Sequence, residues 1–448
     1  MSGPTPEAPA ARDAAPPAEP GPPARPVRQL LAAGAGHFVE AYDWYLYGYL
    51  AVYFAARVFP SSSGDSLVPL LDSFAVFALA FAARPIGALV MGRYADRSGR
   101  RATLTVTISL MGLGSLLMGL APDYRSAGLL APLLVVVGRL LQGFSLGGEY
   151  AAASVFLLES ARPDRRALFT SFQYVAATAG HIVAGLLVVA AAHATDDSMG
   201  TWGWRLPLIA GALLSAVGLW LRRGARETHR AVPEARRPAP GGMFAGVRRY
   251  PVASLLVFGL TVGGTVGYYV WTSFLPVYAQ LTVHADKADA VLSGTLSLVV
   301  FGVLQPFAGA LSDRIGRRPM LVAFGVLSVF GTVPLLGMLS GSFWNLVLVQ
   351  SLGMLAVTPY TAVAGAAVAE LFPADYRARG TGLPYAAAVA LFGGTAPYVG
   401  TWFKAAGRTD AFPWYIAVLG GVTAVTALLA RDLDRAPEPA ADPVRTLN

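Results

Sequence analysis

The chain of 448 residues contains no cysteine and little charge. Without cysteine it forms neither a disulfide framework nor a thiolate metal site. Lysine is nearly absent, since Lys287 and Lys404 are the only two, and neither follows a glycine. The chain therefore lacks the G-x-x-x-x-G-K-[ST] loop that an ATP-driven pump needs. It also lacks the H-E-x-x-H zinc motif, and we expect no nucleophile elbow, so the sequence argues against an enzyme, a metal site or a cofactor.

Charged residues make up 13% of the chain, against about 25% in an ordinary soluble domain. Hydrophobic residues reach 55%. A run of about 20 mostly apolar residues crosses a bilayer as a helix, whereas a transmembrane β-strand would alternate in segments of about ten residues. The sequence therefore predicts an all-α membrane protein with twelve transmembrane helices in two six-helix bundles. Their expected ranges are 29–56, 70–93, 102–121, 130–159, 167–193, 204–222, 251–280, 287–311, 319–340, 344–371, 377–405 and 412–430.

The net charge of +8 reflects topology and not nucleic-acid binding. If both termini are cytoplasmic, 26 of the 34 Lys and Arg residues fall on the cytoplasmic side and five on the other side. This split follows the positive-inside rule. It predicts an even number of spans, with both termini cytoplasmic, in a multi-pass protein of the plasma (inner) membrane.

Composition divides the chain into five parts. Residues 1–28 are rich in proline and alanine without an apolar core, so they form a disordered tail and not a signal peptide. Residues 29–222 form the first six-helix bundle, 223–250 a basic cytoplasmic linker and 251–430 the second bundle. Residues 431–448 form a second tail. Because the short C-terminal tail has no heptad pattern, nothing indicates a coiled coil, and we expect a monomer.

The two halves repeat one loop motif. Gly92-Arg-Tyr-Ala-Asp-Arg-Ser-Gly-Arg-Arg101 recurs as Gly309-Ala-Leu-Ser-Asp-Arg-Ile-Gly-Arg-Arg318, each between two apolar stretches. Glu159 and Glu370 likewise end matching helices, each just before a pair of arginines. Two similar membrane-embedded halves that enclose a site are typical of a secondary transporter.

The charged and glycine residues of the loop motifs are candidates for gating. Their glycines allow a sharp turn, and their arginines can bind carboxylates and helix-end carbonyls. The alternative is a solvated turn whose charges only set topology, but the repetition favours gating. The candidate gating residues are Gly92, Asp96, Gly99, Arg100, Arg101, Asp313, Gly316, Arg317 and Arg318.

The sequence resembles the major facilitator superfamily and, within it, the metabolite:proton symporters. Both loop motifs carry the superfamily signature, and narrower matches run along the whole chain. They are Phe38-Val-Glu-Ala-Tyr-Asp-Trp-Tyr45, Arg84-Pro-Ile-Gly87, Arg139-Leu-Leu-Gln-Gly-Phe-Ser-Leu-Gly-Gly-Glu-Tyr150, Trp202-Gly-Trp-Arg-Leu-Pro207, Glu370-Leu-Phe-Pro373 and Phe392-Gly-Gly-Thr-Ala-Pro397. The resemblance implies the major facilitator fold and a proton-coupled carrier that imports an organic acid.

Ionisable residues inside the predicted helices are costly in a bilayer and normally face a partner or a cavity. Glu40 and Asp43 share one face of the first helix. In related symporters an acid of helix 1 pairs with an arginine of helix 4 and carries the proton, which Asp43 and Arg139 resemble. A permanent ion pair is the alternative. Glu149, about three turns after Arg139, is either a further proton site or a packing residue.

Candidate substrate contacts come next. An arginine inside the membrane can clamp a carboxylate with two hydrogen bonds, which favours Arg84, whereas Arg205 lies near a helix end and is also positioned to reach the interface. His181, together with His37, stands where the family resemblance implies an amide, and either a titrating or a purely hydrogen-bonded role is open. Further aromatic candidates for the cavity wall include Tyr268, Tyr360, Tyr269, Trp271, Tyr278 and Tyr385.

The leading hypothesis is therefore a proton symporter of 2-oxoglutarate or another dicarboxylate that works by rocking two halves about a central site. Its partners are a small organic acid, protons and the lipid bilayer, with no nucleic acid. Carriage of a monocarboxylate, an aromatic acid or a zwitterionic osmolyte remains open, as does export by proton antiport. A sensor that binds without transport is a further class, but the tails are too short for a signalling extension.

Overall fold

The computed structural model describes residues 26–61, 67–147, 161, 163–223, 244–373 and 377–430. Most of both predicted tails and residues 224–243 of the predicted linker lie outside this part of the chain. The described segments are built from helices, with no strand among them.

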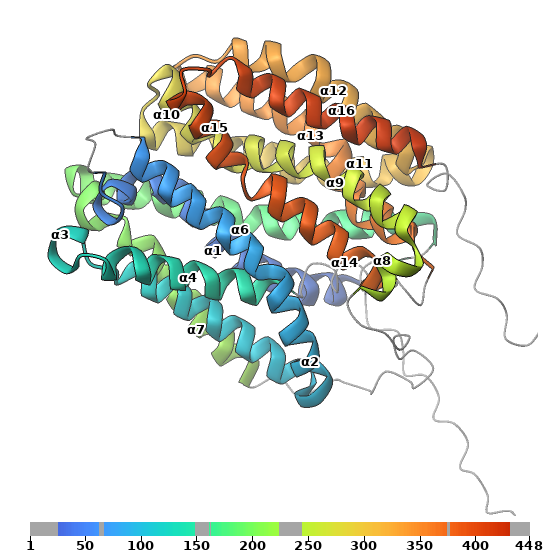
Figure 1. The fold of residues 1–448 in the computed structure, drawn as a ribbon, viewed down its shortest axis with the longest axis horizontal. Coiled ribbons are helices and arrows are strands. Elements are labelled where there is room, and N and C mark those ends of the chain that lie inside the picture. Colours follow the sequence, from blue (N-terminus) through green and yellow to red (C-terminus); the bar gives the residue numbers. More distant parts are fainter. Residues whose placement is uncertain are drawn as a thin grey trace, which may run out of the picture.

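The first half consists of helices that cross the molecule in alternating directions (Figure 1). They are α1 (Pro26–Val58), α2 (Val68–Gly119), α3 (Tyr124–Ala127), α4 (Leu130–Leu146), α6 (Arg166–Thr195) and α7 (Arg205–Arg223). The described part of this half also contains the 3-10 turns η1 (Pro163–Arg165) and η2 (Asp196–Ser198) and the π turn η3 (Met199–Gly203).

The second half repeats the plan, but π-helical turns break two of its helices. The helices are α8 (Ala245–Arg249), α9 (Pro251–Tyr269), α10 (Leu275–Val283), α11 (Lys287–Ile315), α12 (Arg317–Gly337), α13 (Phe343–Glu370), α14 (Arg377–Ala388), α15 (Ala396–Ala405) and α16 (Ala411–Leu429). The π turn η5 (Val270–Phe274) separates α9 from α10, and η7 (Val389–Gly393) lies between α14 and α15. The interruption of the eleventh span falls at Gly393-Gly394 and Pro397, residue types that favour a bend in a helix.

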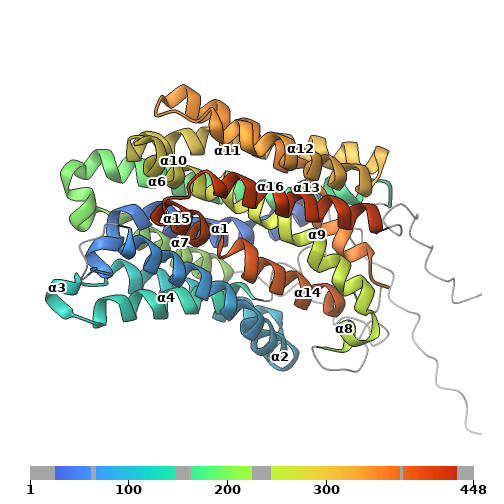
Figure 2. The same cartoon turned by 45° about the horizontal axis from the view of Figure 1, so that its top comes forward.

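One element differs from the sequence prediction. Two helices, 70–93 and 102–121, were expected with a loop between them, but α2 is a single helical element of 52 residues. A straight helix of that length would extend about 78 Å, far beyond a hydrocarbon core of about 30 Å. The ribbon instead reverses near its label in Figures 1 and 2, so α2 forms two antiparallel arms. The two arms supply the two crossings predicted at 70–93 and 102–121.

The described helices suit a membrane. Seven of them are long and apolar enough to cross a bilayer, and three shorter apolar helices add to them, Thr105–Gly119, Leu130–Leu146 and Arg205–Trp220. With α1 and the broken α14–α15 pair, these helices account for the twelve predicted crossings.

The halves meet along α6 and α11, which pack on each other while α6 also packs on α1 (Figure 2). Within the first half, glycines let neighbouring helices approach closely, as is common in membrane bundles. A Cβ on Gly180 of α6 would collide with the carbonyl oxygen of Phe38 in α1, and one on Gly143 of α4 would collide with the carbonyl oxygen of Ala80 in α2. The backbones therefore touch at these points.

Glycine replacements test this packing. We expect Gly180→Ala to destabilise the protein by about 1–3 kcal/mol, because the added methyl meets backbone that has no room to move. Gly331→Ala in α12 is the matched control, since a Cβ there meets nothing within 4 Å. That replacement should raise stability by about 0.5–1 kcal/mol, because alanine favours a helix over glycine. Thermal unfolding in detergent measures both, and equal behaviour of the two variants would contradict the packing.

Candidate substrate site

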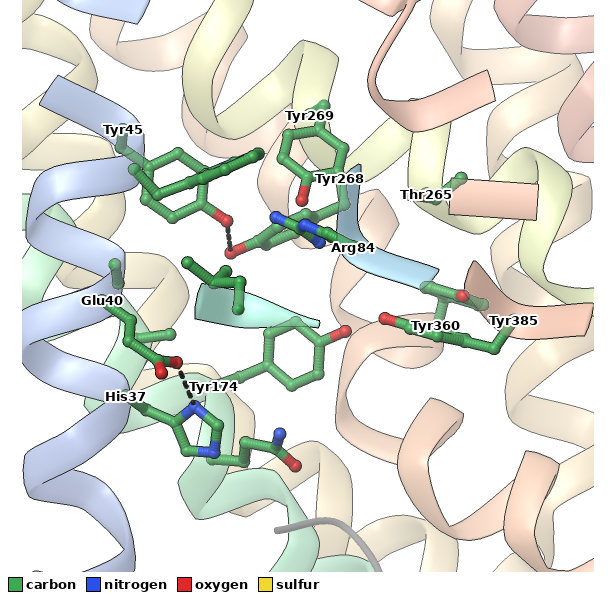
Figure 3. Close-up of a pocket in the computed structure, with 15 residues that line it drawn as sticks. His37, Glu40, Tyr45, Arg84, Tyr174, Thr265, Tyr268, Tyr269, Tyr360 and Tyr385 are labelled. Atoms are coloured by element: carbon green, nitrogen blue, oxygen red, sulfur yellow. Dashed lines mark hydrogen bonds and ion pairs between the residues drawn. The ribbon is translucent and has the colours of Figure 1, made fainter. Parts of the chain in front are cut away.

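A cavity lies between the two halves and contains about 770 Å³ of unoccupied space, part of it continuous with solvent. The wall comes from α1, α2, α4 and α6 of the first half and from α9, α13 and α14 of the second (Figure 3). Its residues are His37, Glu40, Ala41, Trp44, Tyr45, Arg84, Leu146, Gln173, Tyr174, Ala177, Thr265, Tyr268, Tyr269, Tyr360 and Tyr385.

Arg84 of α2 brings a cation into this wall. Its guanidinium carbon lies 4.1 Å from the ring centroid of Trp44 and 4.2 Å from that of Phe81. It forms no hydrogen bond or ion pair with any residue that the structure describes, and its Nε is buried. The aromatic faces hold the guanidinium in place, which leaves its donors available for an anion.

An acid lies in the same wall. Glu40 projects from α1 into the cavity, and its carboxylate lies 3.6 Å from the Nδ1 atom of His37 one turn earlier (Figure 3). Both residues were singled out in the sequence as ionisable groups of the first helix, and both line the cavity. The site therefore offers one arginine and one carboxylate–imidazole pair.

Tyrosines bridge the two halves beside the cavity. The hydroxyl of Tyr45 in α1 donates to that of Tyr268 in α9 at 2.7 Å, and the hydroxyl of Tyr49 donates to the carbonyl oxygen of Thr272 at 3.4 Å. Tyr268 and Tyr360, both expected from the sequence, line the wall, as do Tyr269 and Tyr385. Trp271 and Tyr278, which were also candidates, do not.

His181 is close to the cavity but does not line it. Its ring stacks on that of Tyr45, with centroids 3.8 Å apart and planes 12° apart. The side chain is 1% exposed. Tyr45 therefore separates the imidazole from the cavity in this conformation.

The Asp43 carboxylate and the Arg139 guanidinium belong to one buried network, but they do not pair directly. Ser115 Oγ donates to Asp43 Oδ1 at 2.7 Å, and Gln142 Nε2 donates to Ser115 Oγ at 2.8 Å. Arg139 Nη1 donates to Gln142 Oε1 at 2.7 Å. Both charged residues are completely buried. The predicted partners are thus joined through a serine and a glutamine, which the sequence analysis did not identify.

Trp44 connects this network with the cavity. Its indole ring faces the Arg84 guanidinium at 4.1 Å and the Arg139 guanidinium at 4.3 Å. The sequence reasoning did not single it out, although it directly follows Asp43. An aromatic residue next to an intramembrane acid was the available signal.

The structure places Arg205 outside the wall of the central cavity. Its Nη2 atom lies 3.0 Å from Asp123 Oδ1 and 2.9 Å from the carbonyl oxygen of Ala121, and Nη1 donates to the carbonyl oxygen of Thr201 at 2.7 Å. Asp123 also pairs with Arg57 at 3.3 Å. Arg205 is therefore held in a surface cluster near α3 and is not part of the central wall.

The second loop motif forms a charged cluster that joins the halves. The two Asp313 oxygens accept from the backbone N–H groups of Ala167 and Leu168, both at 2.9 Å, at the start of α6. Arg317 lies 2.9 Å from Asp313 and 3.3 Å from Glu370. Gly316 has a φ of 97°, which permits the turn between α11 and α12. Arg318 donates to the carbonyl oxygen of Leu428 at 2.6 Å.

Other candidates fall outside the described parts. Glu149 and Glu159 lie between residues 147 and 161, where the structure describes nothing. The backbone of the first loop motif is described, but the contacts of its candidate residues are not. These residues are Gly92, Asp96, Gly99, Arg100 and Arg101. Their gating roles remain predictions.

One segment matches the letters of a nucleophile elbow, although none was expected. Gly143-Phe-Ser-Leu-Gly147 reads G-x-S-x-G, which in hydrolases lies on a strand-to-helix turn. Here it lies at the end of α4, and the Ser145 hydroxyl donates to the carbonyl oxygen of Thr107 at 2.8 Å. A Cβ on Gly147 would collide with the carbonyl oxygen of Arg84. The pattern thus serves helix packing.

Known proteins agree with this architecture. Residues 29–232 match the model for sugar (and other) transporters, and residues 281–447 match that of the major facilitator superfamily. The chain is 38% identical over 411 residues to an α-ketoglutarate permease of Escherichia coli K12, covering 90% of this chain and 94% of the relative. It is 34% identical over 414 residues to a citrate-proton symporter of Salmonella typhi, covering 90% and 94%.

Among solved structures, the xylose transporter of E. coli in a partially occluded, inward-open conformation superposes with a TM-score of 0.68. It is 16% identical and covers 91% of this chain and 98% of its own, so it supports the fold alone. The sequence matches and this shared fold lead to one assignment. The chain belongs to the metabolite:proton symporters of the major facilitator superfamily, and it is a membrane transporter and not an enzyme.

Proposed function

We propose that the protein is a proton-coupled symporter that imports a small organic acid, such as 2-oxoglutarate or another dicarboxylate. The observation that carries this proposal is the Arg84 guanidinium, which faces a cavity enclosed by both halves without a protein partner among the described residues. The names of the α-ketoglutarate permease and the citrate-proton symporter add support for an acidic substrate.

Arg84 would bind one carboxylate through two parallel hydrogen bonds, a geometry that a guanidinium favours. No second lysine or arginine lines the described cavity wall. Hydroxyl groups such as those of Tyr268 and Tyr360 would face the rest of the substrate. Glu40 in the same wall also fits a zwitterion, whose cationic group it would accept, so competition by zwitterions separates the two substrate classes.

Proton coupling would use the buried Asp43 network. A carboxylate next to a guanidinium is favoured in its ionised form, and separation from that charge favours the protonated form. Since Asp43 reaches Arg139 only through Ser115 and Gln142, a small helix shift would be enough to change that balance. Glu40, with His37 beside it, is a second candidate proton site because it faces the substrate directly.

Alternating access needs a gate at each end. The Asp313 cluster would close the end at which α8 and the bend of α2 lie (Figure 1). The tyrosine contacts between α1 and α9 would close the other end. We propose that the α8 end is cytoplasmic, together with both termini, in the inner membrane. One chain supplies the cavity and both gates, so a monomer is sufficient.

Uptake of labelled 2-oxoglutarate into proteoliposomes tests the proposal. We expect accumulation that requires an inwardly directed proton gradient and is competed by other dicarboxylates. If folded protein takes up none, the assigned substrate is wrong. Monocarboxylates, aromatic acids, zwitterionic osmolytes and proton-driven export would then be measured in the same vesicles.

Replacing Arg84 tests the carboxylate site. Arg84→Gln should raise KM for 2-oxoglutarate about 10- to 100-fold, because hydrogen bonds to charged groups contribute about 1.5–3 kcal/mol each. Arg125→Gln removes an exposed arginine outside the cavity and is the control. Unchanged affinity in Arg84→Gln, or equal losses for carboxylates and zwitterions, would give Arg84 a structural role.

Replacing Asp43 tests coupling. Asp43→Asn keeps the hydrogen-bonding shape but cannot cycle a proton, so we expect loss of gradient-driven accumulation while exchange of substrate across the membrane continues. Asp72→Asn, an exposed acid in α2, should leave accumulation intact. Persistence of accumulation in Asp43→Asn would move the proton site elsewhere, with Glu40→Gln as the next variant.

Replacing Asp313 tests the gate at the α8 end. Asp313→Asn loses the charge that binds two backbone N–H groups and Arg317, so this end should open more often. Because the chain has no cysteine, Ala177→Cys in the cavity wall gives a clean reporter. We expect faster maleimide labelling from the α8 side in Asp313→Asn than in the exposed control Arg314→Ala. Equal labelling rates would remove Asp313 from gating.

A further inference from the structure

His181 lies midway along α6, where α6 is packed between α1 and α11. It is 1% exposed, and neither ring nitrogen has a hydrogen-bond partner among the described residues. Burying a polar group without a partner is energetically unfavourable. A conformation that gives the ring nitrogens of His181 a hydrogen-bond partner would remove this cost.

Two tyrosines of α1 cover the imidazole. The ring of Tyr45 stacks on it at 3.8 Å, and the ring of Tyr49 lies 5.2 Å away with planes 33° apart. Tyr45 is itself one of the residues that line the cavity. One aromatic ring therefore separates the imidazole from the substrate space.

Both tyrosines depend on the second half for their positions. Tyr45 donates to the hydroxyl of Tyr268, and Tyr49 donates to the carbonyl oxygen of Thr272 at the π turn η5. The Thr272 hydroxyl donates to the backbone carbonyl oxygen of Tyr268 at 2.6 Å, so the two residues that accept these bonds lie one helical turn apart on the same segment. The end of the molecule at which α3 and α10 lie, opposite α8, is called the α3–α10 end (Figure 1). Separation of the halves at this end would break both contacts together. Tyr45 would then lose the bond that holds its ring over His181.

We propose that His181 is a substrate-binding residue of the conformation that opens at the α3–α10 end, and that Tyr45 covers it in the present one. This inference rests on the proposed function. The exposed imidazole would donate an N–H to a carboxylate oxygen of the substrate, and so supply a nitrogen donor in addition to Arg84. The substrate would meet Arg84 and His181 in the open state, and Arg84 without His181 in the present state.

Cysteine labelling tests the exposure. In a chain without cysteine, His181→Cys should react with a membrane-impermeant maleimide from the α3–α10 side. Tyr45→Phe in the same chain should increase the rate, because the bond to Tyr268 is lost. Ala131→Cys, completely buried in α4 on the inner side of the first half, is the control and should stay unreactive. No labelling of His181→Cys in either background, or labelling from the α8 side alone, would overturn the proposal.

Sided transport kinetics test the binding. His181→Phe keeps an aromatic ring against Tyr45 but removes the N–H donor. We expect KM for 2-oxoglutarate to rise about tenfold from the α3–α10 side, equivalent to about 1.4 kcal/mol, and to stay unchanged from the α8 side. His181→Gln restores a donor and should recover part of the loss. Equal changes on both sides, or none, would overturn the proposal, whereas failure of the unmodified protein to transport 2-oxoglutarate would reject the proposed substrate and leave the labelling result to decide exposure.

Discussion

Two positive charges share one indole ring at the centre of the first half. The guanidinium groups of Arg84 and Arg139 lie 4.1 and 4.3 Å from the ring of Trp44. Like charges repel strongly where little water screens them, so this arrangement requires compensation. The aromatic faces supply part of it, and the chain from Arg139 through Gln142 and Ser115 to Asp43 supplies more. An anion bound at Arg84 would relieve the repulsion between the two guanidinium groups. Substrate binding at Arg84 and protonation of Asp43 would then both change the charge around Arg139.

This arrangement needs helices that approach within backbone contact. The glycines of α4 rest on the carbonyl oxygens of Ala80 and Arg84, so α2 and α4 cannot move apart without losing that fit. Gly211 of α7 does the same for the network, because a Cβ there would collide with Asp43 Oδ1. These glycines thus determine how closely the helices that carry the charged residues approach. A larger side chain would meet a backbone carbonyl oxygen in α2 or the carboxylate of Asp43.

The sequence predicted the architecture well and the contacts less well. Apolar runs, charge asymmetry and the repeated loop motif pointed to twelve helices in two halves, because each is a local or additive property. The bounds of α2 escaped this reasoning, because helical turns continue into the segment between its two arms, where two glycines suggested a loop. The link between Asp43 and Arg139 depends on the rotamers of Ser115 in α2 and of Gln142, one turn after Arg139 in α4, which no spacing reveals. Arg205 is bound by Asp123 and by the carbonyl oxygens of Ala121 and Thr201 near a helix end, partners that its sequence position does not reveal.

The two halves repeat in sequence but differ in stiffness. The first and fifth crossings of the first half, α1 and α6, are unbroken helices, whereas the corresponding crossings of the second half contain the π turns η5 and η7. A π turn leaves one residue out of the regular ladder, so it gives a helix a place to shear. The π turn η3 of the first half lies instead between α6 and α7, at the end of a crossing. Bending during the transport cycle would then fall within the first and fifth crossings of the second half and at the end of a crossing in the first.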